Sequence, residues 1–222
     1  MEPIRESVSV IGGGSWGTAI AQLAADAGAD VLMWVRDPSK AEAINRTRRN
    51  EVYWPQFELG ENVRATGDLE ALAGHARLIF SAAPSHGFRD IARELGSYIG
   101  GDHILIHGTK GLEPDTQKRM SEIIKEETPA KRIGVLCGPN IAEETMQRQP
   151  AATVVASKYP EVVERAQAAL ASPSFRVYGG RDPLGVRRGS FVPGEPHVEG
   201  PRLRKPCRQR AGWSCVYDLE IR

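Results

Sequence analysis

The residues best suited to chemistry in this sequence form a glycine-rich turn near its start, Gly12-Gly13-Gly14-Ser15-Trp16-Gly17. The turn follows a short β-branched run at 7–12 and opens an apolar segment with helical spacing, which is the context of a dinucleotide site. Gly12 would allow the tight turn, Gly14 would let the backbone approach a pyrophosphate, and Gly17 would permit close helix-to-strand contact. The turn therefore predicts that NAD or NADP binds here, and a glycine turn without a ligand is the alternative.

The choice between the two cofactors depends on the end of the next predicted strand, Trp34-Val35-Arg36-Asp37. An acid at this place bonds a ribose 2′-hydroxyl, whereas an arginine accommodates a 2′-phosphate. Arg36 is placed to reach the adenosine ribose, and Asp37 suits the N-cap of a helix that starts at Pro38. The pair favours acceptance of NADP and leaves NAD open.

Three further loops follow predicted strands, and each carries residues that suit a ligand site. They are Ala83-Pro84-Ser85-His86, His107-Gly108-Thr109-Lys110-Gly111 and Cys137-Gly138-Pro139-Asn140. Ligands bind at the carboxyl edge of a parallel sheet, where such loops meet. Pro84 could border the nicotinamide end, and Lys110 is the candidate catalytic residue. A solvated surface lysine is the alternative, and His86 and His107 are rival acid–base groups.

The elements that must position these loops alternate between strand and helix over about 170 residues. This order predicts an α/β fold, a doubly wound and mostly parallel sheet of the Rossmann type with helices on both faces. Strands are expected at 7–12, 31–35, 63–66, 77–83, 103–107, 133–137, 152–157 and 175–178. Helices are expected after the glycine turn, from 37, and at 69–73, 87–99, 116–127, 142–146 and 160–171.

Composition excludes several classes of protein. The 222 residues carry a net charge of +1, so no nucleic-acid partner is expected. No apolar run approaches the roughly 18–20 residues of a membrane span, so a cytoplasmic protein without membrane contact is expected. Three cysteines are too few for a zinc site, and no metal is expected.

The strand–helix pattern stops after Val186, where arginine, proline and glycine dominate. We therefore divide the chain into a cofactor-binding domain at 7–186 and an irregular tail at 187–222. A reading-frame shift, a truncation or a disordered extension would each produce such a tail.

These motifs together resemble the bacterial NAD(P)-dependent glycerol-3-phosphate dehydrogenases. The matching segments run in order through nearly all of 7–186: GGGSWGTAIA (12–21), WVRDP (34–38), NEVYWPQFELGENVRATGDL (50–69), APSH (83–86), TKGLEP (109–114), GPNIAEE (138–144), ATVVAS (152–157) and FRVYGGRDPLGV (175–186). The resemblance implies reversible hydride transfer between NAD(P)H and dihydroxyacetone phosphate. The product would be sn-glycerol 3-phosphate, a glycerophospholipid precursor, and a homodimer is possible.

The resemblance also implies roles for individual residues. Ser15, Trp16, Arg36, Lys110 and Ala142 would contact the cofactor, and Lys110, Gly138 and Asn140 would contact the substrate. The family usually has serine or threonine where Asn140 stands, and asparagine can also donate and accept hydrogen bonds.

The resemblance breaks after Val186. Relatives continue into an Ala-Leu-Lys-Asn helix, whose lysine is the expected general acid–base, and then into a helical substrate domain. Neither follows in this sequence, so a cofactor-binding fragment without turnover is the alternative function.

Overall fold

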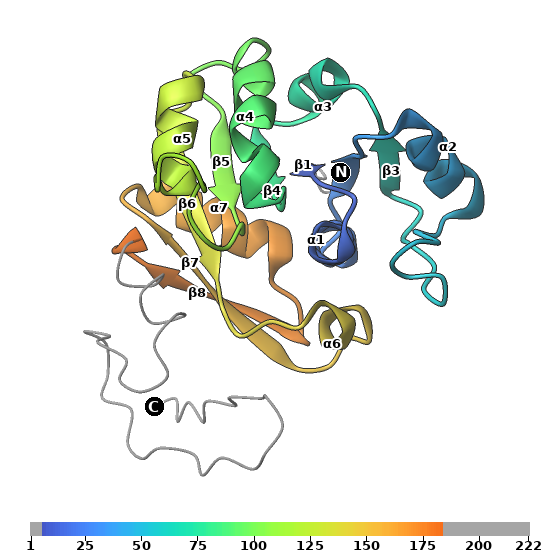
Figure 1. Cartoon of the computed structure of the whole chain (residues 1–222). Coiled ribbons are helices and arrows are strands. Elements are labelled where there is room, and N and C mark those ends of the chain that lie inside the picture. Colours follow the sequence, from blue (N-terminus) through green and yellow to red (C-terminus); the bar gives the residue numbers. More distant parts are fainter. Residues whose placement is uncertain (1–5, 184–222) are drawn as a thin grey trace, which may run out of the picture.

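A sheet of eight strands forms the centre of the molecule, in the order β3-β2-β1-β4-β5-β6-β7-β8 (Figure 1). The computed structural model describes residues 6–183, and the predicted tail at 187–222 lies outside this range. The strands are β1 (Ser7–Ile11), β2 (Asp30–Trp34), β3 (Val63–Thr66), β4 (Leu78–Ser81), β5 (Ile104–His107), β6 (Arg132–Cys137), β7 (Ala151–Ser157) and β8 (Phe175–Gly180). The predicted mostly parallel sheet is confirmed, with β7 antiparallel to β6.

The register brings the strand ends that precede the candidate loops to one edge of the sheet. Ile11 of β1 pairs with Trp34 of β2 on one side and with Ser81 of β4 on the other. Ser81 in turn pairs with His107 of β5. The chain leaves β1 toward β2 and β3 and later crosses back to β4, which makes the β1–β4 boundary the switch point where α/β sheets bind ligands.

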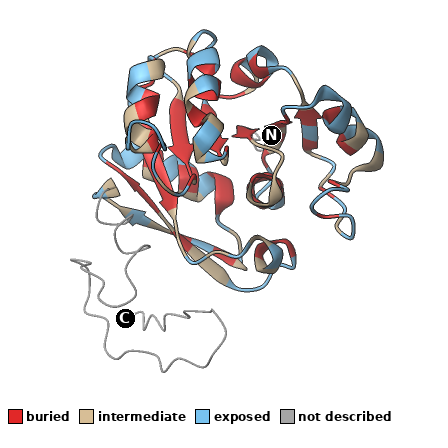
Figure 2. Cartoon of the chain, viewed as in Figure 1, coloured by how far each residue is buried: buried red, intermediate tan, exposed pale blue. Residues whose placement is uncertain are grey.

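Helices cover both faces of this sheet. They are α1 (Ser15–Asp26), α2 (Pro38–Thr47), α3 (Leu69–His75), α4 (Phe88–Gly96), α5 (Met120–Glu127), α6 (Ala142–Met146) and α7 (Pro160–Leu170), with a 3-10 turn at Ser85–Gly87. Helices α1 and α7 pack in one apolar cluster, and α3, α4 and α5 pack in a second. Figure 2 shows the buried strands between these layers. No helix in residues 6–183 has the length and apolar character to cross a membrane.

One predicted helix begins later than expected. Helix α5 starts at Met120 rather than at Thr116. Gln117 has a φ of +57°, which no helix accommodates, and the Glu122 carboxylate accepts a hydrogen bond from the Arg119 N–H at 2.9 Å. This contact between the N-cap backbone and the third helical residue marks the start of α5. The preceding residues instead form a loop that returns toward α4.

Candidate functional site

The glycine turn has the backbone geometry that its sequence predicts. Gly12 has a φ of +115°, in the region that favours glycine. A Cβ added to Gly17 would lie 1.8 Å from the carbonyl oxygen of Gly12, so only glycine allows α1 to start this close to β1. A Cβ added to Gly14 would meet nothing within 4 Å. The glycine turn is therefore tightly packed at Gly17 and has free space at Gly14.

Two side chains that sequence reasoning missed hold this turn from behind. The Asn50 amide donates hydrogen bonds to the Gly13 carbonyl at 2.9 Å and to the Thr18 hydroxyl at 2.8 Å. The Trp54 indole N–H donates to the Ser15 carbonyl at 3.1 Å. The segment that carries Asn50 and Trp54, between α2 and β3, thus packs against the start of α1.

The predicted cofactor residues Trp16 and Arg36 lie against neighbouring strand-end loops. The Trp16 indole nitrogen is 3.1 Å from where a Gly108 Cβ would stand, which places the indole on the loop after β5. A guanidinium nitrogen of Arg36 is 3.0 Å from the corresponding point on Gly87. Arg36 therefore bridges the space between the ends of β2 and β4 and stays exposed.

The Asp37 carboxylate is the N-cap of α2, as predicted. It accepts hydrogen bonds from the Ser39 N–H at 3.0 Å and from the Ser39 hydroxyl at 2.7 Å. The hydroxyl bond is the main reason why the pKa of Asp37 is below its ordinary value. The hydrogen-bonding capacity of this carboxylate is thus used in capping α2.

Lys110 lies on an exposed part of the loop after β5, between a buried Thr109 and Gly111 with a φ of +85°. The Thr109 hydroxyl donates to the Ala83 carbonyl at 2.6 Å. This bond ties the Lys110 loop to the loop that carries Pro84, which is itself exposed. The structure thus brings two of the three predicted loops together directly.

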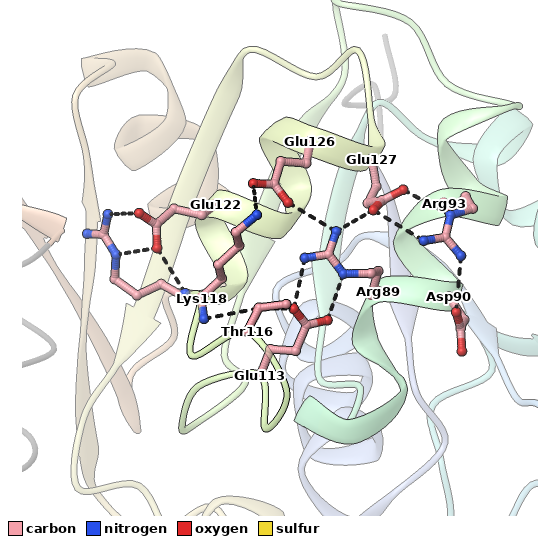
Figure 3. Close-up of polar contacts among 10 residues, drawn as sticks. Arg89, Asp90, Arg93, Glu113, Thr116, Lys118, Glu122, Glu126 and Glu127 are labelled. Carbon is pink, nitrogen blue, oxygen red and sulfur yellow. Dashed lines mark hydrogen bonds and ion pairs between the residues drawn. The ribbon is translucent and has the colours of Figure 1, made fainter.

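A second anchor of the Lys110 loop is the ion-pair cluster in Figure 3. The Arg89 guanidinium of α4 donates two hydrogen bonds to Glu113, at 2.7 and 2.8 Å, and one to Glu126 at 3.0 Å, and it also pairs with Glu127. The Arg89 and Glu113 side chains are only 21% and 10% exposed. Hydrogen bonds from Arg89, and then from Thr116, lower the pKa of Glu113 to about 2.

The third predicted loop follows β6. The Asn140 amide nitrogen lies 2.8 Å from where a Gly138 Cβ would stand, so the amide packs directly over Gly138. This nitrogen is buried and has no hydrogen-bond partner among residues 6–183. Ala142, half-buried, begins α6. A buried donor without an acceptor suits a ligand oxygen at this place.

The two histidine candidates have different surroundings. His107 is fully buried, and its ring packs edge-on against Phe88 with centroids 6.2 Å apart. His86 is exposed and lies in the 3-10 turn. No three His, Cys, Asp or Glu side chains within the described part of the chain are grouped to hold a metal ion.

Comparisons with known proteins agree with this geometry. A family model described as the NAD-dependent glycerol-3-phosphate dehydrogenase N-terminus matches residues 7–163. The glycerol-3-phosphate dehydrogenase (NAD(P)+) of Acinetobacter baumannii strain SDF is 44% identical over 185 residues, which are 83% of this chain and 52% of that protein. The corresponding protein of Pseudomonas aeruginosa strain LESB58 is 43% identical over 188 residues, 85% of this chain and 55% of its own length.

Solved structures show the same relationship. Glycerol-3-phosphate dehydrogenase from Coxiella burnetii superposes with a TM-score of 0.80 at 27% identity, covering 86% of this chain and 58% of that one. The yeast (Saccharomyces cerevisiae) enzyme superposes with a TM-score of 0.73 at 28% identity, covering 82% and 58%. This chain spans about half the length of the curated relatives it matches. It belongs to the NAD-dependent glycerol-3-phosphate dehydrogenase family, of which it carries the N-terminal domain.

Proposed function

We propose that this chain binds NADPH or NADH with the pyrophosphate on the glycine turn. The observation that carries the proposal is the contrast between two glycines of that turn. Gly17 is packed against a backbone oxygen, whereas Gly14 faces open space at the N-terminus of α1. Free N–H groups and the positive end of the helix dipole attract phosphate at such a place.

Substitution of Gly14 tests the cofactor site without disturbing the fold. Gly14 has φ and ψ of −81° and −176°, an extended conformation that valine adopts readily. Because an added Cβ meets no protein atom, Gly14→Val should melt within a few degrees of the wild type. Its side chain would occupy the space of the pyrophosphate, so the Kd for NADPH and NADH should rise at least about tenfold.

Gly74→Ala is the matched control. A Cβ at this position in α3 also meets nothing within 4 Å. The next residue, His75, contacts the Asp30 carbonyl at the start of β2, the sheet edge opposite the glycine turn. Calorimetric titration of both variants and the wild type should show weakened binding in Gly14→Val alone. An unchanged Kd in Gly14→Val would contradict the proposed pyrophosphate site.

The proposed reaction is reversible hydride transfer between NAD(P)H and dihydroxyacetone phosphate, giving sn-glycerol 3-phosphate. Family membership supports the reaction, and the placement of Lys110 beside the Pro84 loop supports a role for its ammonium group at the substrate carbonyl. A cation there would stabilise the alkoxide that develops as hydride arrives at C2. Gly138 and Asn140 would bind the substrate from the neighbouring loop.

A cofactor-binding fragment without turnover is the second candidate. It is favoured by the sequence after Val186, which lacks the Ala-Leu-Lys-Asn motif of the relatives. Mixing the chain with NADPH and dihydroxyacetone phosphate distinguishes the two. Steady NADPH oxidation that disappears in Lys110→Ala supports the dehydrogenase, and tight NADPH binding without oxidation supports the fragment.

We also propose a cytoplasmic location and a homodimer, as the resemblance to the bacterial enzymes implies. Sedimentation equilibrium of the chain checks the second expectation, because a dimer has twice the 24.3 kDa of one chain.

A further inference from the structure

The side chain of Asn50 has unusual partners for a residue in an irregular segment. It is only 3% exposed, and both hydrogen bonds of its amide nitrogen go to the start of α1, to the Gly13 carbonyl and the Thr18 hydroxyl. A carbonyl oxygen can only accept, so the group of Asn50 that faces Gly13 must be the NH2 and not the amide oxygen. Asparagine is therefore required here as a donor.

The bond to Gly13 fixes the direction of a neighbouring N–H group. The Gly13 carbonyl and the Gly14 N–H belong to one planar trans peptide, so they point in opposite directions. With the carbonyl held toward Asn50, the Gly14 N–H points away from the segment that packs behind the turn. That N–H belongs to the residue whose Cβ position is open, where the pyrophosphate is proposed to lie.

Trp54 repeats this arrangement on the next part of the turn. Its indole N–H donates to the Ser15 carbonyl, which shares a peptide plane with the Trp16 N–H. Trp54 is 6% exposed, and its own N–H donates to the Asn50 carbonyl at 2.6 Å. Asn50 and Trp54 are thus joined in one tight turn that holds two peptide groups of the glycine turn.

From these contacts we propose that Asn50, with Trp54, is a positioning residue for the pyrophosphate site. Asn50 holds the Gly13 carbonyl and Trp54 holds the Ser15 carbonyl. The N–H groups of Gly14 and Trp16, on the opposite side of the same two peptides, then point at the phosphates. The proposal rests on the cofactor binding proposed above and assigns a function to a segment, 50–54, that sequence reasoning placed in no site. N–H groups that already point toward the phosphates need no reorganisation when the cofactor binds.

The chain offers a matched control in Asn62. Its amide donates to the carbonyls of Ala25 at 3.0 Å and Ala29 at 2.6 Å, at the opposite end of α1. Asn50→Ala and Asn62→Ala therefore remove the same kind of side chain, each bonded to the same helix, and only the first loses a bond to the glycine turn. Trp54→Phe removes the bond to Ser15 and keeps an aromatic ring in the core.

The test is titration of the full chain and its three variants with NADPH, each at a temperature well below its own melting midpoint. Asn50→Ala should weaken binding about tenfold, and Trp54→Phe should weaken it a few-fold. Asn62→Ala should lower the melting midpoint and leave the Kd within about twofold of the wild type. At saturating NADPH the emission maximum of the bound nicotinamide should be the same in all four proteins, because the change is confined to the turn.

The outcomes separate this proposal from the one it rests on. If the wild type fails to bind NADPH and NADH, the proposed function is wrong and the positioning role falls with it. If the wild type binds and a folded Asn50→Ala binds equally well, only the positioning role is overturned. Equal weakening by Asn62→Ala, or a shifted emission maximum in Asn50→Ala, would overturn it too, since either result indicates general loosening. If Asn50→Ala does not fold, an unchanged Kd in Trp54→Phe overturns the proposal.

Discussion

The neighbouring residues Arg36 and Asp37 at the end of β2 have different partners, and this difference predicts a preference for NADPH. The Asp37 carboxylate is bonded to Ser39 and caps α2, whereas the Arg36 guanidinium is exposed beside Gly87. A 2′-phosphate would bond to that guanidinium, and charge-assisted bonds of this kind are strong. Arg36→Ala should therefore weaken NADPH binding about tenfold and NADH binding less than about twofold.

Calorimetric titration with both cofactors checks this prediction. Arg64→Ala is a suitable control, because it removes an exposed arginine that pairs with Asp30 at the start of β2, the end away from the candidate site. Equal losses for NADPH and NADH in Arg36→Ala would contradict a 2′-phosphate contact.

Prediction from the sequence succeeded at single residues whose role is set by adjacent residues. The tight turn at Gly12, the close packing of Gly17 and the N-cap at Asp37 all follow from local chain geometry. Asn50 was missed because its partners lie 37 and 32 positions away in the chain. A buried asparagine carries no local pattern that shows which carbonyl it will meet.

Among the elements, the loop between β5 and α5 depends on one arginine of α4. Arg89 binds Glu113 through two hydrogen bonds and also reaches Glu126 and Glu127 on α5 (Figure 3). Removing the guanidinium would leave three carboxylates near one another without their shared partner. Arg89→Leu should therefore raise amide exchange across residues 111–119 about tenfold and leave α7 unchanged.

Hydrogen exchange followed by mass spectrometry measures both segments in one experiment. The exposed pair of Arg64 and Asp30 again provides the control, because Arg64→Leu should change neither segment. Wild-type exchange rates in the 111–119 segment of Arg89→Leu would show that Arg89 does not anchor the Lys110 loop.

The same cluster predicts how stability depends on pH. Arg89 lowers the pKa of Glu113 from 4.5 to about 2, and Arg119 lowers that of Glu122 equally. A lowered folded-state pKa stabilises the fold above the ordinary pKa, and this stabilisation is lost as pH falls from about 4.5 through about 2. Glu113→Gln should therefore be less stable than the wild type at pH 7, with the difference shrinking toward pH 2. Melting midpoints across this pH range measure the change, and a constant difference would contradict the assignment.

The sequence predicted the helices and strands well where apolar spacing determines the element. The prediction failed at the start of α5, where polar side-chain contacts determine it. All eight strands were expected close to their observed positions. Most are short apolar runs buried in the sheet, whereas β3 and β8 alternate buried and exposed residues. The start of α5 was wrong because Thr116 bonds Glu113 instead of opening a helix. The direction of β7 could not be read from its residues, because parallel and antiparallel strands buried on both faces share the same apolar pattern.

On the scale of the whole molecule, both faces of the sheet are already covered by helices within residues 6–183. The apolar cluster under α1 and α7 includes Phe175 and Val177 of β8, so the last strand belongs to the same core. The family model ends earlier, at residue 163, before α7 is complete. The core therefore extends at least through β8, and the domain boundary at 186 stays a prediction.

This boundary predicts the behaviour of shortened chains. A chain that ends at Val186 should keep a cooperative melt within about 3 °C of the full chain and the same Kd for NADPH within about twofold, because it retains both apolar clusters. A chain that ends at Leu170 lacks β8 and the buried Phe175, which exposes the open side of β7 and apolar surface beneath it. That chain should lose its cooperative melt and associate, since an uncovered strand edge promotes pairing with other chains. Calorimetry and light scattering compare the three proteins, and a well-folded chain ending at Leu170 would place the boundary of the domain before β8.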